Sequence, residues 1–188
     1  MPLPVVRRFL AAIALVFGLL APAQALALPM LLVDMRTGEV LYGEDAGQPW
    51  HPASLTKLMT AYVTFAAIKQ GRIGLDAKVT ISQNAWNQAP SKSGLEVDSA
   101  ITLKDALYIL VVKSANDVAV AIAETVSGSV PAFVDEMNAM ARAMGLTATH
   151  YENPHGLHHA AQITSARDLA VLALYIRQSF PQYDAIFG

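Results

Sequence analysis

Residues 52–60 read Pro-Ala-Ser-Leu-Thr-Lys-Leu-Met-Thr, and this stretch decides the fold because it opens a long apolar helix. The helix is predicted to run from about Ser54 to Gln70, with Gly71 as its C-terminal stop. Its apolar positions recur at helical spacing, at Leu55, Leu58, Met59, Tyr62, Val63 and Ala66. Ser54 therefore stands at the start of a helix, with Lys57 one turn further along.

Ser54 and Lys57 are spaced so that they can act together. Positions i and i+3 lie on one face of a helix, so the Lys57 amine can reach the Ser54 hydroxyl. A serine hydroxyl is a weak nucleophile until a base removes its proton. A lysine can be that base if burial or a nearby cation lowers its pKa, and the helix N-terminus offers N–H groups to a developing oxyanion. Taken alone, a helix cap and a solvated lysine explain the pair better.

Upstream of this helix, the sequence predicts a β-hairpin. Two apolar runs, at residues 30–34 and 39–42, flank a turn that contains Gly38. A polar loop at 43–52 leads into the helix. Because a two-stranded hairpin is only marginally stable alone, the sheet is expected to be incomplete within these 188 residues.

Downstream of Gly71, the pattern is mainly helical. Residues 79–82 are short enough to be either a strand or a connector. Further helices are expected at about 103–112 after Thr102, at 116–126, from Ser129 to Gly145, and after Thr164-Ser165.

The N-terminus has the parts of a secretory signal peptide. Arg7 and Arg8 precede an apolar run at 9–21, and cleavage after either Ala25 or Ala27 fits the small-residue rule. Residues 1–25 are therefore predicted to be a signal peptide, with an uncleaved anchor or a buried first helix as the alternatives.

Charge and cysteine content exclude several classes of function. Without Arg7 and Arg8 the chain keeps 11 basic and 15 acidic residues, and no basic stripe remains, which argues against nucleic acid as a partner. Cysteine is absent, so there is neither a disulfide framework nor thiolate chemistry.

A second motif, Ser114-Ala115-Asn116, falls at a junction between two predicted helices. Such a junction can bring a serine and an amide side chain into a cleft. Ser114 could relay a proton between Lys57 and a leaving amine, and Asn116 could bind a substrate amide and hold Lys57. Taken alone, this motif is also explained better by helix capping.

The two motifs occur together and in order, within a longer series of characteristic stretches: Val33-Asp34, Thr37-Gly38-Glu39-Val40-Leu41, residues 52–60, Ser114-Ala115-Asn116-Asp117, Asn153-Pro154-His155-Gly156-Leu157 and Thr164-Ser165-Ala166-Arg167-Asp168-Leu169-Ala170. These stretches resemble the low-molecular-mass D-alanyl-D-alanine carboxypeptidases, the penicillin-binding proteins of serine peptidase family S11. The resemblance extends over nearly all of the mature chain.

This resemblance implies a role for each motif residue. Ser54 would be the acyl-ester nucleophile, Lys57 the general base, Ser114 a further catalytic residue and Asn116 a substrate-binding residue. The substrate would be a peptidoglycan stem peptide ending in D-Ala-D-Ala, from which the terminal D-alanine leaves before water releases the acyl-enzyme. β-Lactams would acylate the same serine. The resemblance implies no cofactor, and it implies export to the periplasm or cell envelope.

The resemblance also implies the fold, an α/β (α+β) domain of the penicillin-binding transpeptidase and β-lactamase type. A mostly antiparallel sheet would be flanked by helices, with a helical subdomain that carries Ser114. The family's third element, Lys-Thr-Gly on a sheet strand, does not occur in the sequence. We therefore expect residues 28–188 to be the N-terminal part of the catalytic domain, with the C-terminal strands missing and an apolar sheet edge exposed. Because one lost oxyanion donor costs about 10²–10³ in rate, the chain alone is expected to be poorly active. Where members of the family have a membrane-attachment helix, it lies at the C-terminus, so contact with the inner-membrane surface would depend on such a segment.

Two alternatives stay open. A class A β-lactamase or a D,D-endopeptidase relative shares the first two motifs, but a β-lactamase needs an activating Glu, and Glu152 is the only acid near the 153–156 loop. A catalytically inactive wall-associated module would explain the absent third motif. His155, His158 and His159 could in principle bind zinc, but their spacing favours a structural turn, and no metal site is predicted.

Overall fold

The structure is a computed structural model that describes residues 28–187, so the predicted signal peptide at 1–25 lies outside the described residues. Short helical turns are labelled η; η1 and η3 are 3₁₀ turns, and η2 is a π-helical turn. The elements, in chain order, are β1 (Met30–Val33), β2 (Val40–Glu44), η1 (Ala53–Leu55), α2 (Thr56–Lys69), β3 (Lys78–Thr80), α3 (Gln83–Trp86), β4 (Ala100–Thr102), α4 (Leu103–Tyr108), η2 (Ile109–Lys113), α5 (Asn116–Ser127), α6 (Val130–Ala143), α7 (Ala166–Ser179) and η3 (Pro181–Ile186).

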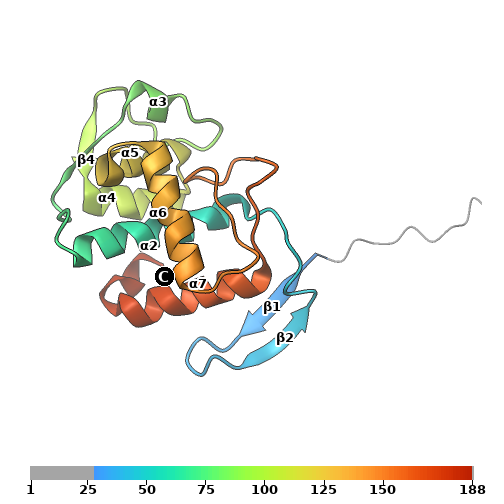
Figure 1. The fold of residues 1–188 in the computed structure, drawn as a ribbon. Helices are drawn as coiled ribbons and strands as arrows, with labels where there is room; N and C mark the ends of the chain where they lie inside the picture. The colour runs from blue at the N-terminus through green and yellow to red at the C-terminus, as the bar shows by residue number, and fades with distance from the viewer. Residues whose placement is uncertain (1–27, 188) are drawn as a thin grey trace, which may run out of the picture.

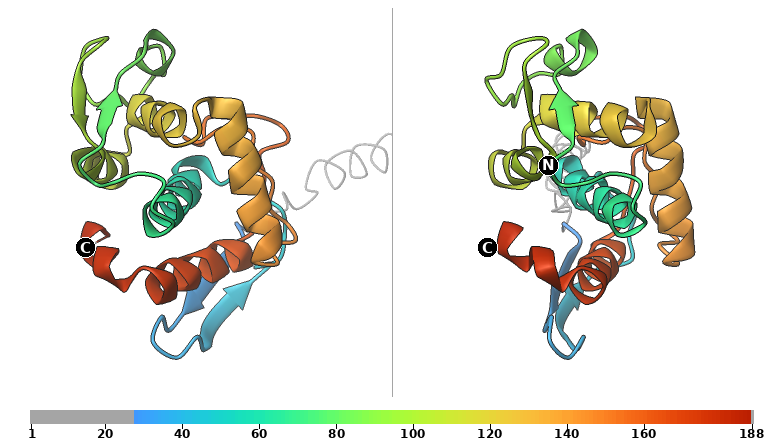
Figure 2. Two further views of the ribbon diagram at one scale, coloured as in Figure 1. Left: turned by 60° about the vertical axis from the view of Figure 1, so that its left-hand side comes forward. Right: turned by 90° about the vertical axis from the view of Figure 1, so that its left-hand side faces the viewer.

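Helix α2 is the central helix of the described chain. It contacts α5, α6 and α7, and these helices surround it in the ribbon views (Figures 1 and 2). Most of its side chains are buried, including polar ones, because neighbours cover it on several sides. Met59, Val63 and Ala66 are buried as the helical spacing predicted, but Leu55 is 52% exposed, so its assignment to the core face is wrong.

The start of this helix differs from the prediction. Ser54 lies in the 3₁₀ turn η1, and the α-helix begins two residues later at Thr56. The turn follows from the backbone of Ala53, whose φ of 47° is a left-handed value that an α-helix cannot contain. At the other end, Gly71 adopts φ 71° directly after the helix, which confirms it as the stop.

Three of the other helices, α4, α6 and α7, begin at the caps that the sequence indicated. The side chains of Thr102, Ser129 and Ser165 each accept a hydrogen bond from a backbone N–H three residues later, as N-caps do. The predicted helix 103–112 is not continuous, however. It is α-helical only as far as Tyr108 and then widens into the π-helical turn η2, which ends at Lys113 and has Ser114 as its C-cap.

Strands form two separate antiparallel pairs within residues 28–187. The predicted hairpin is present as β1 and β2, in which Leu32 pairs with Tyr42. The second pair, β3 and β4, was not predicted as a pair because each strand has only three residues, too few for a visible alternation. In Figure 1 this pair lies far from the hairpin, at the opposite end of the molecule.

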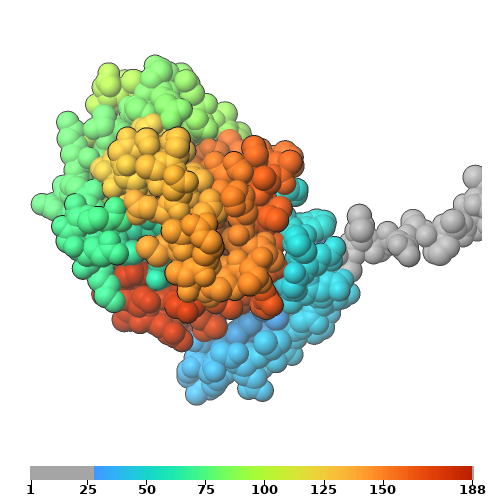
Figure 3. All heavy atoms as spheres, viewed as in Figure 1, coloured from blue at the N-terminus to red at the C-terminus, as the bar shows by residue number. Residues whose placement is uncertain are grey.

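The hairpin is apolar but little covered. It packs on α7 through β1, and Figure 3 shows it as a protruding edge of the molecule. Its large apolar side chains are 50–59% exposed, at Met30, Leu32, Val40, Leu41 and Tyr42. This agrees with the expectation that a hairpin alone makes an incomplete sheet in these residues.

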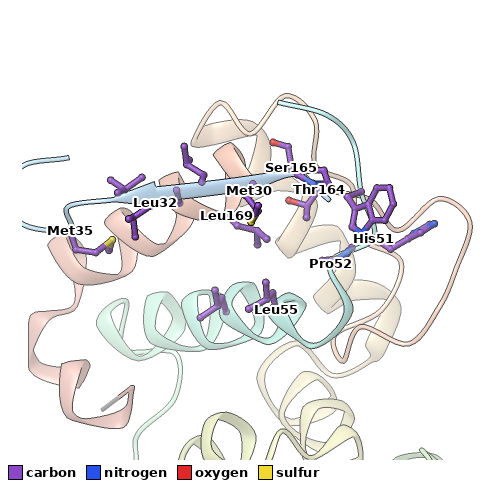
Figure 4. A pocket seen from close by; sticks show the side chains of 16 residues that line it. Met30, Leu32, Met35, His51, Pro52, Leu55, Thr164, Ser165 and Leu169 are labelled. Atoms are coloured by element: carbon purple, nitrogen blue, oxygen red, sulfur yellow. The ribbon is translucent and has the colours of Figure 1, made fainter. Parts of the chain in front are cut away.

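A mostly apolar cavity of about 540 Å³ lies between β1, the start of α2 and α7. Figure 4 shows Met30 and Leu32 of the strand on one side, with Leu55 and Leu169 facing them from the helices. The cavity lies beneath the hairpin, and His51 is the only titratable side chain in its lining.

Helices α5 and α6 follow each other at an angle of 85° and supply much of the buried core. Among residues 28–187, no single helix has the length and apolarity needed to cross a membrane, and only this bent pair meets both criteria when taken together.

The stability of α4 should depend on its buried face. Leu107 is fully buried, so Leu107→Ala is expected to lower the free energy of unfolding by about 2–5 kcal/mol through lost transfer energy and a residual cavity. Urea unfolding followed by circular dichroism measures this. Lys104→Ala, at an exposed position of the same helix, should change stability by less than about 0.5 kcal/mol. Equal effects of the two variants would show that the packing of α4 is wrongly described.

Candidate active site

Lys57 is the point at which three distant segments meet. Its Nζ donates a hydrogen bond of 2.8 Å to Oδ1 of Asn116 and another of 2.7 Å to the backbone carbonyl of His155. The same Nζ lies 3.5 Å from Oγ of Ser54. The i, i+3 spacing thus brings Ser54 and Lys57 into contact, as the sequence predicted, and Asn116 reaches Lys57 as well.

The environment of Lys57 favours its neutral form. The side chain is buried, and within residues 28–187 it takes part in no ion pair. Burial penalises the charged ammonium and lowers the pKa of Lys57 from 10.5 to about 8. A lysine with this pKa is a partly deprotonated base at neutral pH, which an exposed lysine is not.

The hydrogen bonds of Lys57 determine where the lone pair of the neutral amine points. Asn116 Oδ1 and the His155 carbonyl carry no hydrogen, so each can only accept an N–H from Lys57. A neutral amine has two such hydrogens and one lone pair. With both hydrogens bound to these two oxygens, the lone pair is left for the third neighbour, the Ser54 hydroxyl.

Ser54 itself is accessible. It is exposed and opens on a cleft of about 500 Å³, which adjoins the cavity beneath the hairpin because Pro52, Leu55 and Leu58 line both. The cleft is lined by η1 (Ala53–Leu55), here called the nucleophile turn, by the start of α2, and by residues in and directly after η2. Its lining residues are Pro52, Ala53, Ser54, Leu55, Lys57, Leu58, Val111 and Ser114. The polar side chains of Ser54, Lys57 and Ser114 therefore line one cleft whose other lining residues are apolar.

Ser114, the residue directly after η2, also lines this cleft. Its backbone has φ 56°, a left-handed conformation that costs energy for a residue other than glycine. Its Oγ is buried and, among the described residues, makes no hydrogen bond. A buried hydroxyl without a partner is rare, and here it lies where an external group could become its partner. The structure thus brings Ser54, Lys57, Ser114 and Asn116 to one site.

A loop that the sequence analysis did not single out supports the second motif from behind. The backbone N–H of Asn116 donates to the carbonyl of Ser91, and its Nδ2 donates to the carbonyl of Ala89. Asp117 is fully buried and accepts hydrogen bonds from the N–H and hydroxyl of Ser93. No local pattern could have revealed these contacts, because they join segments more than twenty residues apart.

The Asn153–Gly156 loop forms the opposite wall of the Lys57 site. Besides the His155 carbonyl, the Pro154 carbonyl accepts a hydrogen bond of 2.6 Å from Thr60 of α2. Gly156 has φ 95°, and a Cβ on it would overlap the backbone carbonyl of Ala53. Only glycine allows the loop this close to the nucleophile turn. The resemblance pointed to this segment but assigned it no role.

His155 serves structure rather than acid–base chemistry. Burial and the nearby charge of Lys57 lower the pKa of His155 to about 4, and its Nδ1 accepts the N–H of Leu157. The ring of His158 lies edge-on to His51, with centroids 4.9 Å apart. Within the described part of the chain, no three His, Asp or Glu side chains converge as a metal site would require.

Comparison with known proteins gives the same family over almost the whole chain. The family model described as peptidase S11, D-alanyl-D-alanine carboxypeptidase, matches residues 19–186. The D-alanyl-D-alanine carboxypeptidase DacA of Haemophilus influenzae is 38% identical over 175 residues, which are 92% of this chain and 44% of the relative. DacF of Bacillus subtilis is 37% identical over 143 residues, which are 76% of this chain and 37% of that protein.

Solved structures agree with these sequence relatives. The D-alanyl-D-alanine carboxypeptidase DacD from Francisella tularensis superposes with a TM-score of 0.82 at 34% identity, over 89% of this chain and 40% of that one. Penicillin binding protein 5 from Haemophilus influenzae gives a TM-score of 0.80 at 37% identity, over 88% of this chain and 49% of that one. The described residues therefore have the predicted penicillin-binding fold, and the chain spans less than half the length of these relatives.

The order of the motifs, the geometry around Lys57 and the match to the family model agree. The chain belongs to the peptidase S11 family of D-alanyl-D-alanine carboxypeptidases.

Proposed function

We propose that this chain carries the nucleophile, the base and the second catalytic element of a serine-type D-Ala-D-Ala carboxypeptidase. The substrate is a peptidoglycan stem peptide, from which the enzyme removes the terminal D-alanine. The observation that carries the proposal is the position of the Lys57 amine, held by two carbonyl oxygens with its third direction open to Ser54. The family and the names of its relatives supply the substrate class.

Acylation begins at Ser54. Neutral Lys57 takes the hydroxyl proton as Oγ attacks the carbonyl carbon of the penultimate D-alanine, forming a tetrahedral oxyanion. Collapse of this intermediate breaks the bond to the terminal amine and leaves an ester on Ser54. The departing nitrogen needs a proton, which Lys57 supplies through the Ser114 hydroxyl. The unpartnered Oγ of Ser114 in the same cleft supports this relay.

Deacylation repeats the sequence with water as the nucleophile. Lys57, neutral again, takes a proton from the water that attacks the ester, and Ser54 recovers its hydroxyl proton. Asn116 keeps Lys57 in place through Oδ1 and, with one of its Nδ2 hydrogens bound to Ala89, has a second to offer to a substrate carbonyl. β-Lactams follow the acylation half of this route. The proposed compartment is the periplasm or cell envelope.

The β-lactamase alternative has little support in the site. A class A enzyme needs a glutamate that activates the deacylating water. Glu152 instead pairs with His150 at 3.0 Å and is absent from the lining of the Ser54 cleft. The alternative of a catalytically inactive wall-associated module rests on the absence of Lys-Thr-Gly from the 188 residues. Labelling with a β-lactam distinguishes this alternative from an active enzyme.

Acylation should depend on Ser54. We expect a fluorescent penicillin to label the protein covalently and Ser54→Ala to abolish the label, since the Ser54 hydroxyl supplies the attacking oxygen. Labelling is read on denaturing gels, using the 188-residue chain and a version extended by any residues that its reading frame encodes after Gly188.

Ser127→Ala, a hydroxyl outside the cleft that bonds Glu136, is the control and should label normally. Absence of label from both unsubstituted forms, or label that survives Ser54→Ala, would contradict the proposal.

The rate of acylation should rise with pH. The reactive form of Lys57 is neutral, and its pKa of about 8 means that only about a tenth of the molecules hold it at pH 7. The second-order rate constant for acylation should therefore increase roughly tenfold from pH 7 towards a plateau above pH 8–9. Stopped-flow measurement with a chromogenic β-lactam gives this profile.

Lys57→Met should lower the plateau by about 10²–10⁴, the usual contribution of a general base. A rate that falls as pH rises through 8 would show that the protonated lysine is the reactive form and would overturn the assignment.

A further inference from the structure

Gln162 is a buried amide whose hydrogen-bonding capacity is fully used. Only 2% of the residue is exposed. Its Oε1 accepts the backbone N–H groups of Glu152 and Asn153, both at 2.9 Å. Its Nε2 donates to Oγ1 of Thr56 at 3.2 Å and to Oδ1 of Asn153 at 3.1 Å. Two acceptor sites and two donor hydrogens are all engaged, which fixes the orientation of the amide.

These bonds join parts of the chain that lie more than a hundred positions apart. Thr56 is two residues after Ser54 and directly before Lys57. On the other side of Ser54, the ring of His51 donates from Nδ1 to the backbone carbonyl of Gln162 at 2.9 Å. Gln162 therefore bonds to residues on both sides of the nucleophile turn, to Thr56 through its side chain and to His51 through its backbone carbonyl.

The hydrogen bonds from Gln162 to Asn153 help to order the 152–156 loop, which contains the His155 carbonyl. Asn153, which Gln162 binds twice, accepts the N–H groups of His155 and Gly156 at its own Oδ1. The His155 carbonyl then accepts Lys57 at 2.7 Å. A continuous chain of hydrogen bonds thus runs from Gln162 to Nζ of Lys57 by way of Asn153.

We propose that Gln162 is a positioning residue, which ties the 152–156 loop to the nucleophile turn and thereby holds the His155 carbonyl against Nζ of Lys57. Its effect on rate rests on the proposed function, whereas its effect on Lys57 does not. The residue touches no reacting atom and acts only through Asn153 and Thr56.

Loss of this amide has a defined consequence for Lys57. If the loop is released from the turn, water reaches the amine, and the burial that lowers the pKa of Lys57 is reduced. The pKa should then return towards 10.5. A role confined to overall stability would lower the free energy of unfolding and leave the titration of Lys57 in the folded protein unchanged.

The experiment measures the pKa of Lys57 by NMR titration of its side-chain signals, assigned by their loss in Lys57→Met. In Gln162→Met, which keeps the length of the side chain and removes every hydrogen bond, we expect a rise of at least about half a unit. The acylation rate at pH 7.5 should fall by about threefold or more in parallel, because less of the amine is then neutral. Asn138→Leu is the matched control, because Asn138 is another buried amide but bonds only the backbone of Tyr151.

A milder pair covers the case in which Gln162→Met does not fold. Thr56→Val removes only the hydroxyl that Gln162 binds, and it should raise the pKa of Lys57 in the same direction by a smaller amount. Thr64→Val removes a buried hydroxyl of the same helix that bonds only the carbonyl of Thr60, and it should leave this pKa unchanged.

A pKa of Lys57 that stays the same in a folded Gln162→Met, or in Thr56→Val, overturns the proposal. So does an equal rise in Asn138→Leu or in Thr64→Val. Absence of acylation in the unsubstituted protein would count against the proposed function alone, because the titration is read without any substrate.

Discussion

The arrangement of this protein depends on one interaction, the capture of the Lys57 amine between Asn116 Oδ1 and the His155 carbonyl. Both acceptor oxygens carry no hydrogen, so they accept from Lys57 whether its amine is charged or neutral. The remaining position on Nζ faces the Ser54 hydroxyl. A buried lysine without a carboxylate partner would be costly if it stayed charged. The site lowers that cost by hydrogen bonding and by shifting the amine towards its neutral form, which is the form that a serine nucleophile requires.

These contacts require the segments that contain Ser54, Asn116 and His155 to be held at fixed positions around Lys57. Two residues near the site have strained backbone conformations as a result. Ala53 and Ser114 both have left-handed backbones, and each adjoins or forms part of the site. Gly156 lets the loop approach Ala53 more closely than any side chain would allow. These conformations persist because surrounding hydrogen bonds determine them, from Gln162 on one side and from the Ala89–Ser93 loop on the other.

Much of this could be predicted from local sequence. The spacing of Ser54 and Lys57 gave their contact, the capping residues Thr102, Ser129 and Ser165 gave helix starts, and the resemblance gave the fold. What the sequence could not give are contacts between remote segments. The roles of Gln162 and of the His155 carbonyl depend on tertiary approach, and a backbone carbonyl carries no side-chain signature. The π-helical turn before Ser114 was missed because its apolar residues fit an α-helical pattern equally well.

The most direct test of the central claim is the pKa of Lys57 in the unsubstituted, folded protein. The account predicts a midpoint near 8, with the amine largely neutral well below the pH at which an exposed lysine loses its proton. The side-chain carbon and nitrogen shifts of Lys57, followed by NMR from pH 6 to pH 11, report this value without a substrate. A midpoint near 10.5 would mean that fewer than about one molecule in a thousand holds the neutral amine at pH 7, and it would contradict the assignment of Lys57 as the base that activates Ser54.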